Sequence, residues 1–386
     1  MTTFRRGLSF SRPELTLGQK LWNINWMLVI LIAAISTIGF GMLYSASNGN
    51  WDPWASRQIT RFGVGVFAML LVAVIDIRFW MRYAYLFYAA SLLLLASVEL
   101  VGTVGMGAQR WIDLRLFQLQ PSELMKVALV LALARYFHGL TMEEIGRPHY
   151  LITPLVLVMA PIILVLRQPD LGTALLILIA SGALFFAAGV RIWKFALVII
   201  CSLAAIPIAW EFLHEYQQQR ILTFLDPESD PLGAGYHILQ SKIALGSGGM
   251  FGKGFIQGTQ SHLNFLPEKQ TDFIFTMLAE EFGMAGGFLL LGLYGLVILY
   301  GFAIAVRSRS QFGRLVAIGL ATTFFLYVFI NVAMVMGLIP VVGVPLPLIS
   351  YGGTAMLTVL ISFGLILSVS VHRDVVIARR GLDTAL

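Results

Sequence analysis

Apolar residues in this chain come in long runs, and each run is bounded by a polar or basic segment. A helix that crosses the hydrocarbon core of a bilayer needs about 20 predominantly apolar residues. The runs that meet this condition lie near residues 24–44, 59–75, 82–101, 121–138, 151–166, 172–189, 193–212, 273–305, 313–338 and 352–372. We therefore predict an all-α integral membrane protein with about ten transmembrane helices.

The composition supports a membrane protein. Hydrophobic residues make up 58% of the 386 residues, charged residues make up 12%, and the mean hydropathy is +0.83. A soluble domain of this length could not cover so much apolar surface. We expect a single membrane domain over 1–386. The only cysteine, Cys201, excludes an intramolecular disulfide and a cysteine-based metal site.

Basic residues predict the orientation in the membrane. The tails 1–21 and 373–386 and alternate short connections are rich in Lys and Arg, whereas the other short connections hold few. Cytoplasmic segments carry this excess. We expect both tails to be cytoplasmic, and residues 213–272 to form one large extracytoplasmic loop between helices 7 and 8. The net charge of +6 then reflects topology, so nucleic acid is not an expected partner.

Asp272 ends the long polar loop and stands at the start of an apolar helix that also carries Glu280 and Glu281. The pattern Thr271-Asp272 before an apolar run is also typical of a helix N-cap. Carboxylates at a membrane helix are costly and call for partners, a metal or a chemical role. We interpret Asp272 as a candidate catalytic carboxylate.

Glu123 and Lys126 are spaced i, i+3 in PSELMKVALV and therefore share one helix face. They could form a structural ion pair. Alternatively, Lys126 could be the counter-ion of a phosphate or diphosphate that enters from the outer leaflet. Arg110, just before this helix, could extend the same cationic surface.

Two further segments could line an outward-facing site. Asp170, in RQPDLGTALL, precedes a helix; an N-cap is its simplest role, and it could also face the pocket of Asp272. The segment PVVGVPLPLISYGG cannot be regular helix because of its prolines. Irregular backbone at membrane depth is tolerated where it is buried in protein or lines a polar cavity. We expect Ser350 to wall the site.

The glycine-rich stretch 246–258 is not a nucleotide-binding loop. A Walker loop ending at Gly252-Lys253 would need Gly at Ser247 and Ser or Thr at Gly254. The glycines and Lys253 instead indicate a flexible lid, or a backbone that closely approaches a ligand.

Together these motifs resemble the SEDS family (shape, elongation, division, sporulation), and most closely its RodA branch. The resemblance rests on QRWIDL, QPSELMK, QPDLGTA, the run from GAGYHILQSK to TDFIF, and PVVGVPLPLISYGG, in this order. It covers nearly the whole chain. Asp272 matches the family's essential aspartate, and Glu123 and Lys126 match its paired residues, while Arg110 and Asp170 fall in motifs that line the family's cavity.

The resemblance implies a peptidoglycan glycosyltransferase that polymerises lipid II at the outer face of the bacterial cytoplasmic membrane during cell elongation. It implies inverting displacement of undecaprenyl pyrophosphate, with Asp272 as general base and with Lys126, Arg110 or a divalent metal ion (Mg²⁺ or Mn²⁺) facing the leaving group. The implied partners are a class B penicillin-binding protein and other membrane proteins of the elongation complex.

Two other functions fit some of the same residues. A lipid II flippase or other transporter could use intramembrane Glu123, Lys126 and Asp272 along a translocation path. The clustering of polar residues toward the outer side argues against it. A scaffold that only recruits wall enzymes would leave these charges unexplained.

Overall fold

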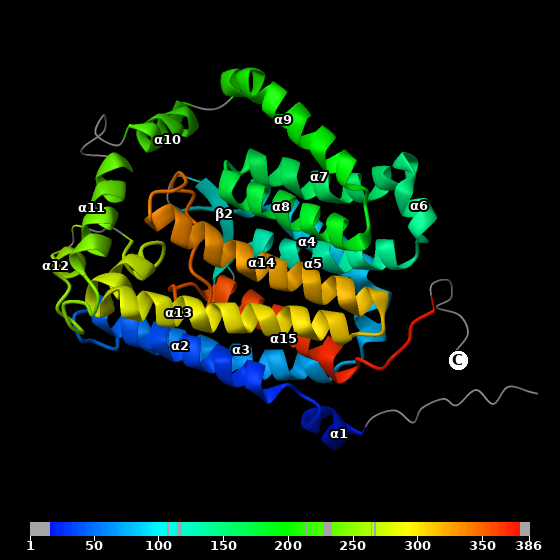
Figure 1. The fold of residues 1–386 in the computed structure, drawn as a ribbon, viewed down its shortest axis with the longest axis horizontal. Helices are drawn as coiled ribbons and strands as arrows, with labels where there is room; N and C mark the ends of the chain where they lie inside the picture. Colours follow the sequence, from blue (N-terminus) through cyan, green and yellow to red (C-terminus); the bar gives the residue numbers. More distant parts are fainter. Residues whose placement is uncertain are drawn as a thin grey trace, which may run out of the picture.

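The computed structural model describes residues 16–105, 108–113, 118–212, 215–226, 234–263, 265 and 268–378. Figure 1 shows a bundle of long helices that run roughly alongside one another. Each predicted span corresponds to one of them. These are α2 (Trp26–Ala46), α3 (Ala55–Val74), α4 (Ile77–Val101), α5 (Pro121–His138), α7 (Ile152–Arg167), α8 (Leu171–Ala188), α9 (Ile192–Phe212), α13 (Ile274–Arg307), α14 (Gln311–Val335) and α15 (Gly353–Val371).

Eight of the described helices are long and apolar enough to cross a membrane. The other two predicted spans differ for visible reasons. α5 carries the charged residues Glu123, Lys126 and Arg135, and the purely apolar part of α9 is only Ile192–Pro207. The prediction of an all-helical membrane protein with about ten spans is confirmed.

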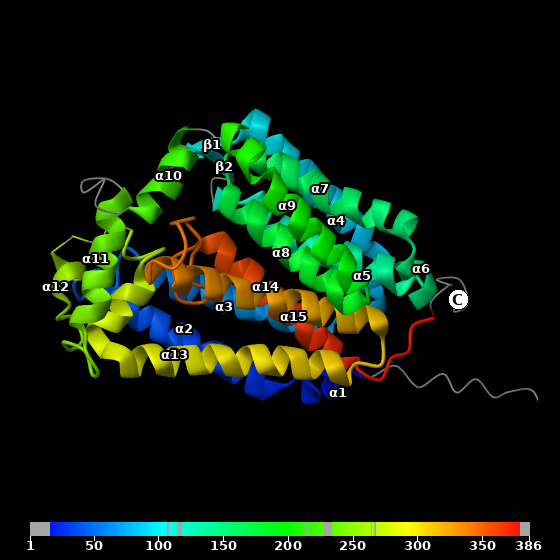
Figure 2. The ribbon, with the colours of Figure 1, turned by 45° about the horizontal axis from the view of Figure 1, so that its top comes forward.

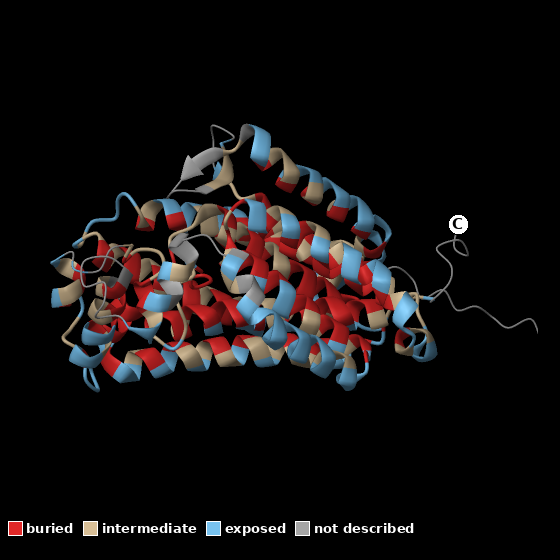
Figure 3. Cartoon of the chain, turned by 90° about the horizontal axis from the view of Figure 1, so that it is seen from above, coloured by how far each residue is buried: buried red, intermediate tan, exposed pale blue. Residues whose placement is uncertain are grey.

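The core of the bundle is built around α14. This helix packs against α5, α8, α13 and α15, and with α15 it is among the most buried spans. Buried residues fill the interior, and exposed residues follow the outer faces of the helices (Figure 3). Many of the exposed side chains are large and apolar, as expected for helices that face lipid. α9 is apolar and exposed along nearly all of its described length, and it diverges from the bundle in Figure 1.

The first described helix and the end of the last one lie at the same end of the bundle. Lys20, on the short helix α1 (Leu17–Trp22), donates to the backbone oxygen of Val74 at 3.0 Å. Ser368, near the end of α15, donates to the neighbouring carbonyl of Ile75 at 2.8 Å. Helices α1 and α15 therefore both contact the junction between α3 and α4. The predicted tails 1–21 and 373–386 lie partly outside the described residues, and their cytoplasmic placement stays a prediction.

The connection between α4 and α5 contains strands that the apolar pattern did not predict. They are β1 (Thr103–Gly105), β2 (Ala108–Asp113) and β3 (Gln118–Leu119), in an antiparallel sheet of order β1-β2-β3. On the cytoplasmic side of the predicted topology, α6 (Met142–Gly146) and the 3₁₀ helix η1 (Pro148–Leu151) connect α5 to α7.

The predicted loop 213–272 holds three helices, α10 (Glu215–Leu225), α11 (Ala234–Ser247) and α12 (Thr259–His262). In Figure 2, α10 and α11 lead away from α9 and back to the start of α13. α11 packs against α13 through Ser241, whose Oγ lies 2.8 Å from Thr276 Oγ1. The same hydroxyl donates to the backbone oxygen of Val335 at the end of α14 (2.7 Å). This segment is therefore a structured cap on one end of the bundle.

The glycine-rich segment docks on a break in α13. Gly283 has φ +67° and ψ −165°, which interrupts the helix. Lys253 and Gly254 donate their N–H groups to the carbonyls of Glu280 and Glu281, both at 3.0 Å. A Cβ on Gly252 would lie 2.1 Å from the Glu281 oxygen. The glycines therefore allow this backbone to approach α13 closely, and the lid or ligand-contacting role predicted for the segment stays a prediction.

Candidate active site

Most of the predicted site residues lie near the N-termini of four helices. α5, α8, α13 and α15 begin close to Glu123, Asp170, Asp272 and Ser350, respectively. Thr354 of α15 donates to the Gln118 carbonyl just before α5 (2.6 Å), which joins two of these starts directly. Helix N-termini carry partial positive charge and favour anions. This end of the bundle is therefore suited to a negatively charged ligand.

Asp272 lies one residue before the N-cap of α13 and is partly buried. A Cβ added to Gly343 would lie 3.5 Å from its Oδ2, so the carboxylate faces the irregular segment between α14 and α15. A Cβ on Gly172, two residues after Asp170, would lie 2.8 Å from the Val342 carbonyl. Backbone of this irregular segment thus approaches both Asp272 and the start of α8.

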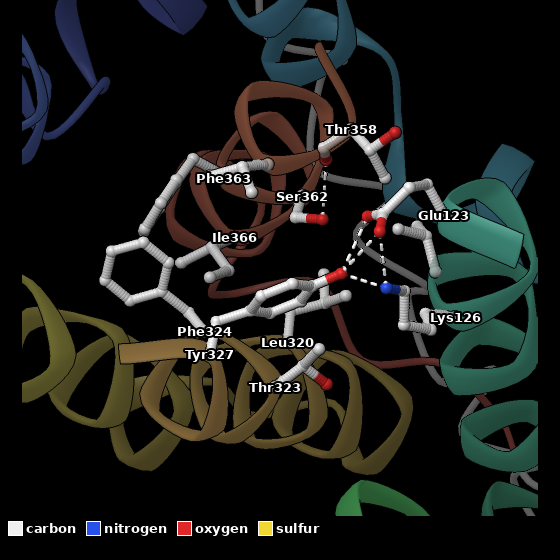
Figure 4. Close-up of a pocket in the computed structure, with 12 residues that line it drawn as sticks. Glu123, Lys126, Leu320, Thr323, Phe324, Tyr327, Thr358, Ser362, Phe363 and Ile366 are labelled. Carbon is white, nitrogen blue, oxygen red and sulfur yellow. Dashed lines mark hydrogen bonds and ion pairs between the residues drawn. The ribbon is translucent and has the colours of Figure 1, made fainter. Parts of the chain in front are cut away.

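Glu123 and Lys126 form a buried cluster with Tyr327 of α14 (Figure 4). Lys126 Nζ donates to Glu123 Oε1 at 2.7 Å and to the Tyr327 hydroxyl. That hydroxyl donates to the Glu123 carboxylate, with distances of 2.7 and 2.8 Å to its two oxygens. Glu123 and Lys126 are only 5% and 6% exposed. The pair predicted from the i, i+3 spacing is formed, and Tyr327 is a third member that the spacing could not indicate.

This cluster borders a small pocket between α5, α14 and α15. Its wall is apolar apart from the cluster itself and the hydroxyl-bearing side chains Thr323, Thr358 and Ser362. Tyr327 and Val359 also line a second pocket, which is walled by residues 345–348 and Ser350. The Glu123–Lys126 cluster and the irregular segment that Asp272 faces therefore border adjoining pockets.

Arg110 and Asp170 contact each other. Arg110 Nη1 lies 3.7 Å from Asp170 Oδ2, and its guanidinium donates to the carbonyls of Gln168 and Pro169 at 3.3 and 2.5 Å. Asp170 caps α8 by accepting from the Thr173 N–H at 3.1 Å. Both residues thus have structural partners, while the Arg110 side chain stays 31% exposed. Their substrate-binding roles stay predictions.

Lys253 and Ser350 are also engaged within the protein. Lys253 Nζ donates to Glu280 Oε1 at 2.8 Å and to Thr259 Oγ1 at 2.7 Å. Ser350 Oγ donates to the Thr271 carbonyl at 2.6 Å and accepts from the Leu346 N–H at 2.8 Å. Lys253 therefore fixes the glycine-rich segment to α13, and Ser350 fixes the segment that carries Asp272. Their substrate-binding roles stay predictions.

A buried ammonium lies close to Asp272 in sequence. Lys269 is 7% exposed and donates to the Ser261 carbonyl at 2.9 Å. Burial lowers the pKa of Lys269, because desolvation disfavours its charged form.

Within the described residues, His, Cys, Asp and Glu side chains form no group of three or more that could hold a metal ion. The described side chains alone thus provide no complete metal-binding set.

Comparison with known proteins identifies the family. The model of the FtsW, RodA and SpoVE family, described as cell cycle protein, matches residues 22–375. The chain belongs to this family. A protein of Escherichia coli (strain K12) named peptidoglycan glycosyltransferase MrdB is 45% identical over 351 residues, which cover 90% of this chain and 93% of that protein. The resemblance drawn from the motifs is confirmed.

More distant members and solved structures agree. Peptidoglycan glycosyltransferase RodA of Treponema pallidum (strain Nichols) is 31% identical, covering 91% of this chain and 98% of that protein. A structure described as structural coordination of polymerization and crosslinking by a peptidoglycan synthase complex contains a chain that is 36% identical, with a TM-score of 0.79 and coverage of 91% and 98%. The crystal structure of Thermus thermophilus rod shape determining protein RodA is 32% identical, with a TM-score of 0.69, and the match covers 91% of this chain and 97% of that chain.

Proposed function

We propose that this chain is a peptidoglycan glycosyltransferase, which polymerises lipid II into glycan strands for cell elongation and rod shape. The observation that carries the proposal is the meeting of Asp272, the Glu123–Lys126 cluster and four helix N-termini at one end of a membrane bundle. A lipid-linked donor keeps its tail in the bilayer and its sugars in water. A site at helix ends beside a structured cap can reach both parts.

In the proposed reaction, Asp272 is the general base. Its carboxylate accepts the proton of the acceptor sugar hydroxyl while that oxygen attacks the anomeric carbon of the donor. The bond from this carbon to the diphosphate oxygen breaks, and undecaprenyl pyrophosphate leaves with the electron pair. One displacement inverts the anomeric configuration. A separate acid is unnecessary, because diphosphate is already a good leaving group.

The departing diphosphate gathers negative charge, so a cation fixed beside it lowers the barrier. Lys126 is proposed for this role, with Glu123 and Tyr327 holding its ammonium in place. Arg110 can extend the cationic surface from β2, since its side chain is partly exposed. A divalent ion (Mg²⁺ or Mn²⁺) would draw ligands from the substrate as well as the protein, since the described side chains form no group of three metal ligands.

The proposed setting is the outer face of the bacterial cytoplasmic membrane. The predicted partner is a class B penicillin-binding protein that crosslinks the new strands, together with other membrane proteins of the elongation complex. A relative solved in a peptidoglycan synthase complex supports an assembly of this kind.

A lipid II flippase is the second candidate. The pocket beside Glu123 and Lys126 favours it, because its wall extends along α15 from Thr358 to Ile366. These residues are eight apart, which is about 12 Å of helix. The pocket therefore reaches from the cluster toward the middle of the bundle.

The test is polymerisation of labelled lipid II by the purified chain in vesicles, together with a penicillin-binding partner that lacks glycosyltransferase capacity. The products are resolved by length, and transbilayer movement of the same lipid is measured in parallel. Long strands without flipping are expected. Flipping without strands from a folded, partnered protein would replace the enzyme with the transporter.

A further inference from the structure

Three consecutive backbone carbonyls around the candidate base are each bound from another part of the chain. The carbonyls of residues 270, 271 and 272 accept, in that order, from the Tyr351 N–H at 2.8 Å, Ser350 Oγ at 2.6 Å and Asn331 Nδ2 at 2.9 Å. Irregular backbone in a buried site needs such partners. Because three neighbouring residues are held, these bonds also fix where the aspartate lies.

Asn331 is the member of this set that comes from a transmembrane helix. It is fully buried on α14, and its Nδ2 also donates to the Val344 carbonyl at 2.8 Å. Both partners are acceptors, so the amide nitrogen must face them. Its Oδ1 is buried with no hydrogen-bond partner among the described residues. Burying this oxygen without a partner costs free energy that an apolar side chain would not cost. The benefit of an amide at this position is therefore the pair of hydrogen bonds that its Nδ2 donates.

Asn331 and Tyr327 are one turn apart on the same face of α14. The spacing i, i+4 places them about 6 Å apart along the helix axis. Tyr327 contacts the Glu123–Lys126 pair, and Asn331 contacts the backbone of Asp272. A single rigid helix face therefore touches both halves of the candidate active site.

We propose that Asn331 is a positioning residue, which sets the distance from the Asp272 carboxylate to the Glu123–Lys126 pair through α14. The inference rests on the proposed function, since it treats Asp272 as the base. A misplacement of about 1 Å in a reacting group can cost about 100-fold in rate. Asn331 touches no reacting atom in this scheme, so its loss should lower turnover and leave substrate binding nearly unchanged.

Two substitutions test this role. Asn331→Leu removes both donors at similar volume, and Asn331→Gln keeps the amide but moves it by one methylene. Ser368→Ala is the matched control, because Ser368 is also buried and also donates to a distant backbone carbonyl, at the other end of the bundle. For each variant, kcat and KM for lipid II are measured per folded molecule, together with the thermal midpoint.

We expect kcat to fall by about 100-fold in Asn331→Leu and by less in Asn331→Gln, while KM changes by less than about twofold. Ser368→Ala should lower the thermal midpoint alone. Normal kcat in the folded fraction, or a rise in KM that accounts for the loss, would overturn the proposal. So would failure of both Asn331 variants to fold, which would assign the residue to stability.

The same series separates this inference from the proposed function. Inactive wild-type protein would remove the function itself, and full turnover by Asp272→Asn would remove the base. If the wild type is active and Asp272→Asn is inactive, any of the contradicting results named above for the Asn331 variants would remove the positioning role and leave the proposed function in place.

Discussion

Tyr327 joins the two charged residues of the buried cluster. Its hydroxyl donates to Glu123 and accepts from Lys126, so it helps to hold the ammonium at one orientation. Sequence spacing predicts the Glu123–Lys126 pair because both residues lie on one helix. It cannot predict the contact of Tyr327 with Glu123 or that of Asn331 with Asp272, because these residues are 204 and 59 positions apart along the chain.

Replacing Tyr327 with Phe should reduce both stability and turnover. The buried pair would lose one hydrogen-bond partner, at a cost of about 1–3 kcal/mol. A less firmly held Lys126 should slow polymerisation by about tenfold. Thermal unfolding and lipid II polymerisation measure the two effects. Tyr88→Phe is the control, because Tyr88 is a buried tyrosine that donates to the Leu157 carbonyl; it should lose stability while keeping its turnover.

The Glu123–Lys126 pair can be tested as a unit. Lys126→Met alone leaves a buried carboxylate without its counter-ion, which should destabilise the protein by about 3–5 kcal/mol. The double variant Glu123→Gln/Lys126→Met should recover most of that loss, because no unpaired charge remains. It should still fail to polymerise lipid II. Turnover that returned along with the thermal midpoint would show that the pair is structural only.

At the scale of elements, the apolar runs predict the helices well. Each of the ten expected ranges contains one of the long helices, because twenty apolar residues in lipid have few alternatives to a helix. The short strands β1–β3 and the helices α10–α12 were not predicted, because polar segments outside the bilayer carry no comparable pattern. The break at Gly283 was also missed, since it depends on docking of the glycine-rich segment.

Gly252→Ala should detach that segment from α13. Gly252 has φ +82°, and a Cβ there would overlap the Glu281 carbonyl. We expect a loss of about 1–3 kcal/mol from the clash, with faster proteolysis within residues 248–263. Gly249→Ala is the matched control, because Gly249 also has positive φ (+55°) but open space around its Cβ position. Equal proteolysis of both variants would show that backbone strain, and not the docking contact, explains the effect.

At the scale of the whole molecule, α9 stands apart from the rest of the bundle. Its side chains are exposed along nearly all of its described length, including the chain's only cysteine, Cys201. An apolar helix with so few contacts to the bundle is expected to be surrounded by lipid. The composition predicted a span in this region, but it could not show that the span packs so little against its neighbours.

Cys201 allows this placement to be tested without mutation. A lipid-soluble maleimide should label the protein in membranes, whereas a charged, membrane-impermeant maleimide should not label it from either side. Labelling is measured by mass spectrometry of intact protein, with detergent-unfolded protein as the positive control. Rapid labelling by the charged reagent would place Cys201 in water and contradict a membrane-embedded α9.

Asp272 carries the proposed chemistry, so its substitution is the most direct test. Asp272→Asn keeps the size of the side chain, and the backbone carbonyl bound by Asn331 is unchanged. The measurement is the length distribution of strands made from labelled lipid II by wild type and variant at equal folded concentration. Each is assayed with a penicillin-binding partner that lacks glycosyltransferase capacity. Long strands from wild type and none from Asp272→Asn are expected. Strands of normal length and rate from the variant would contradict the assignment of Asp272 as the base.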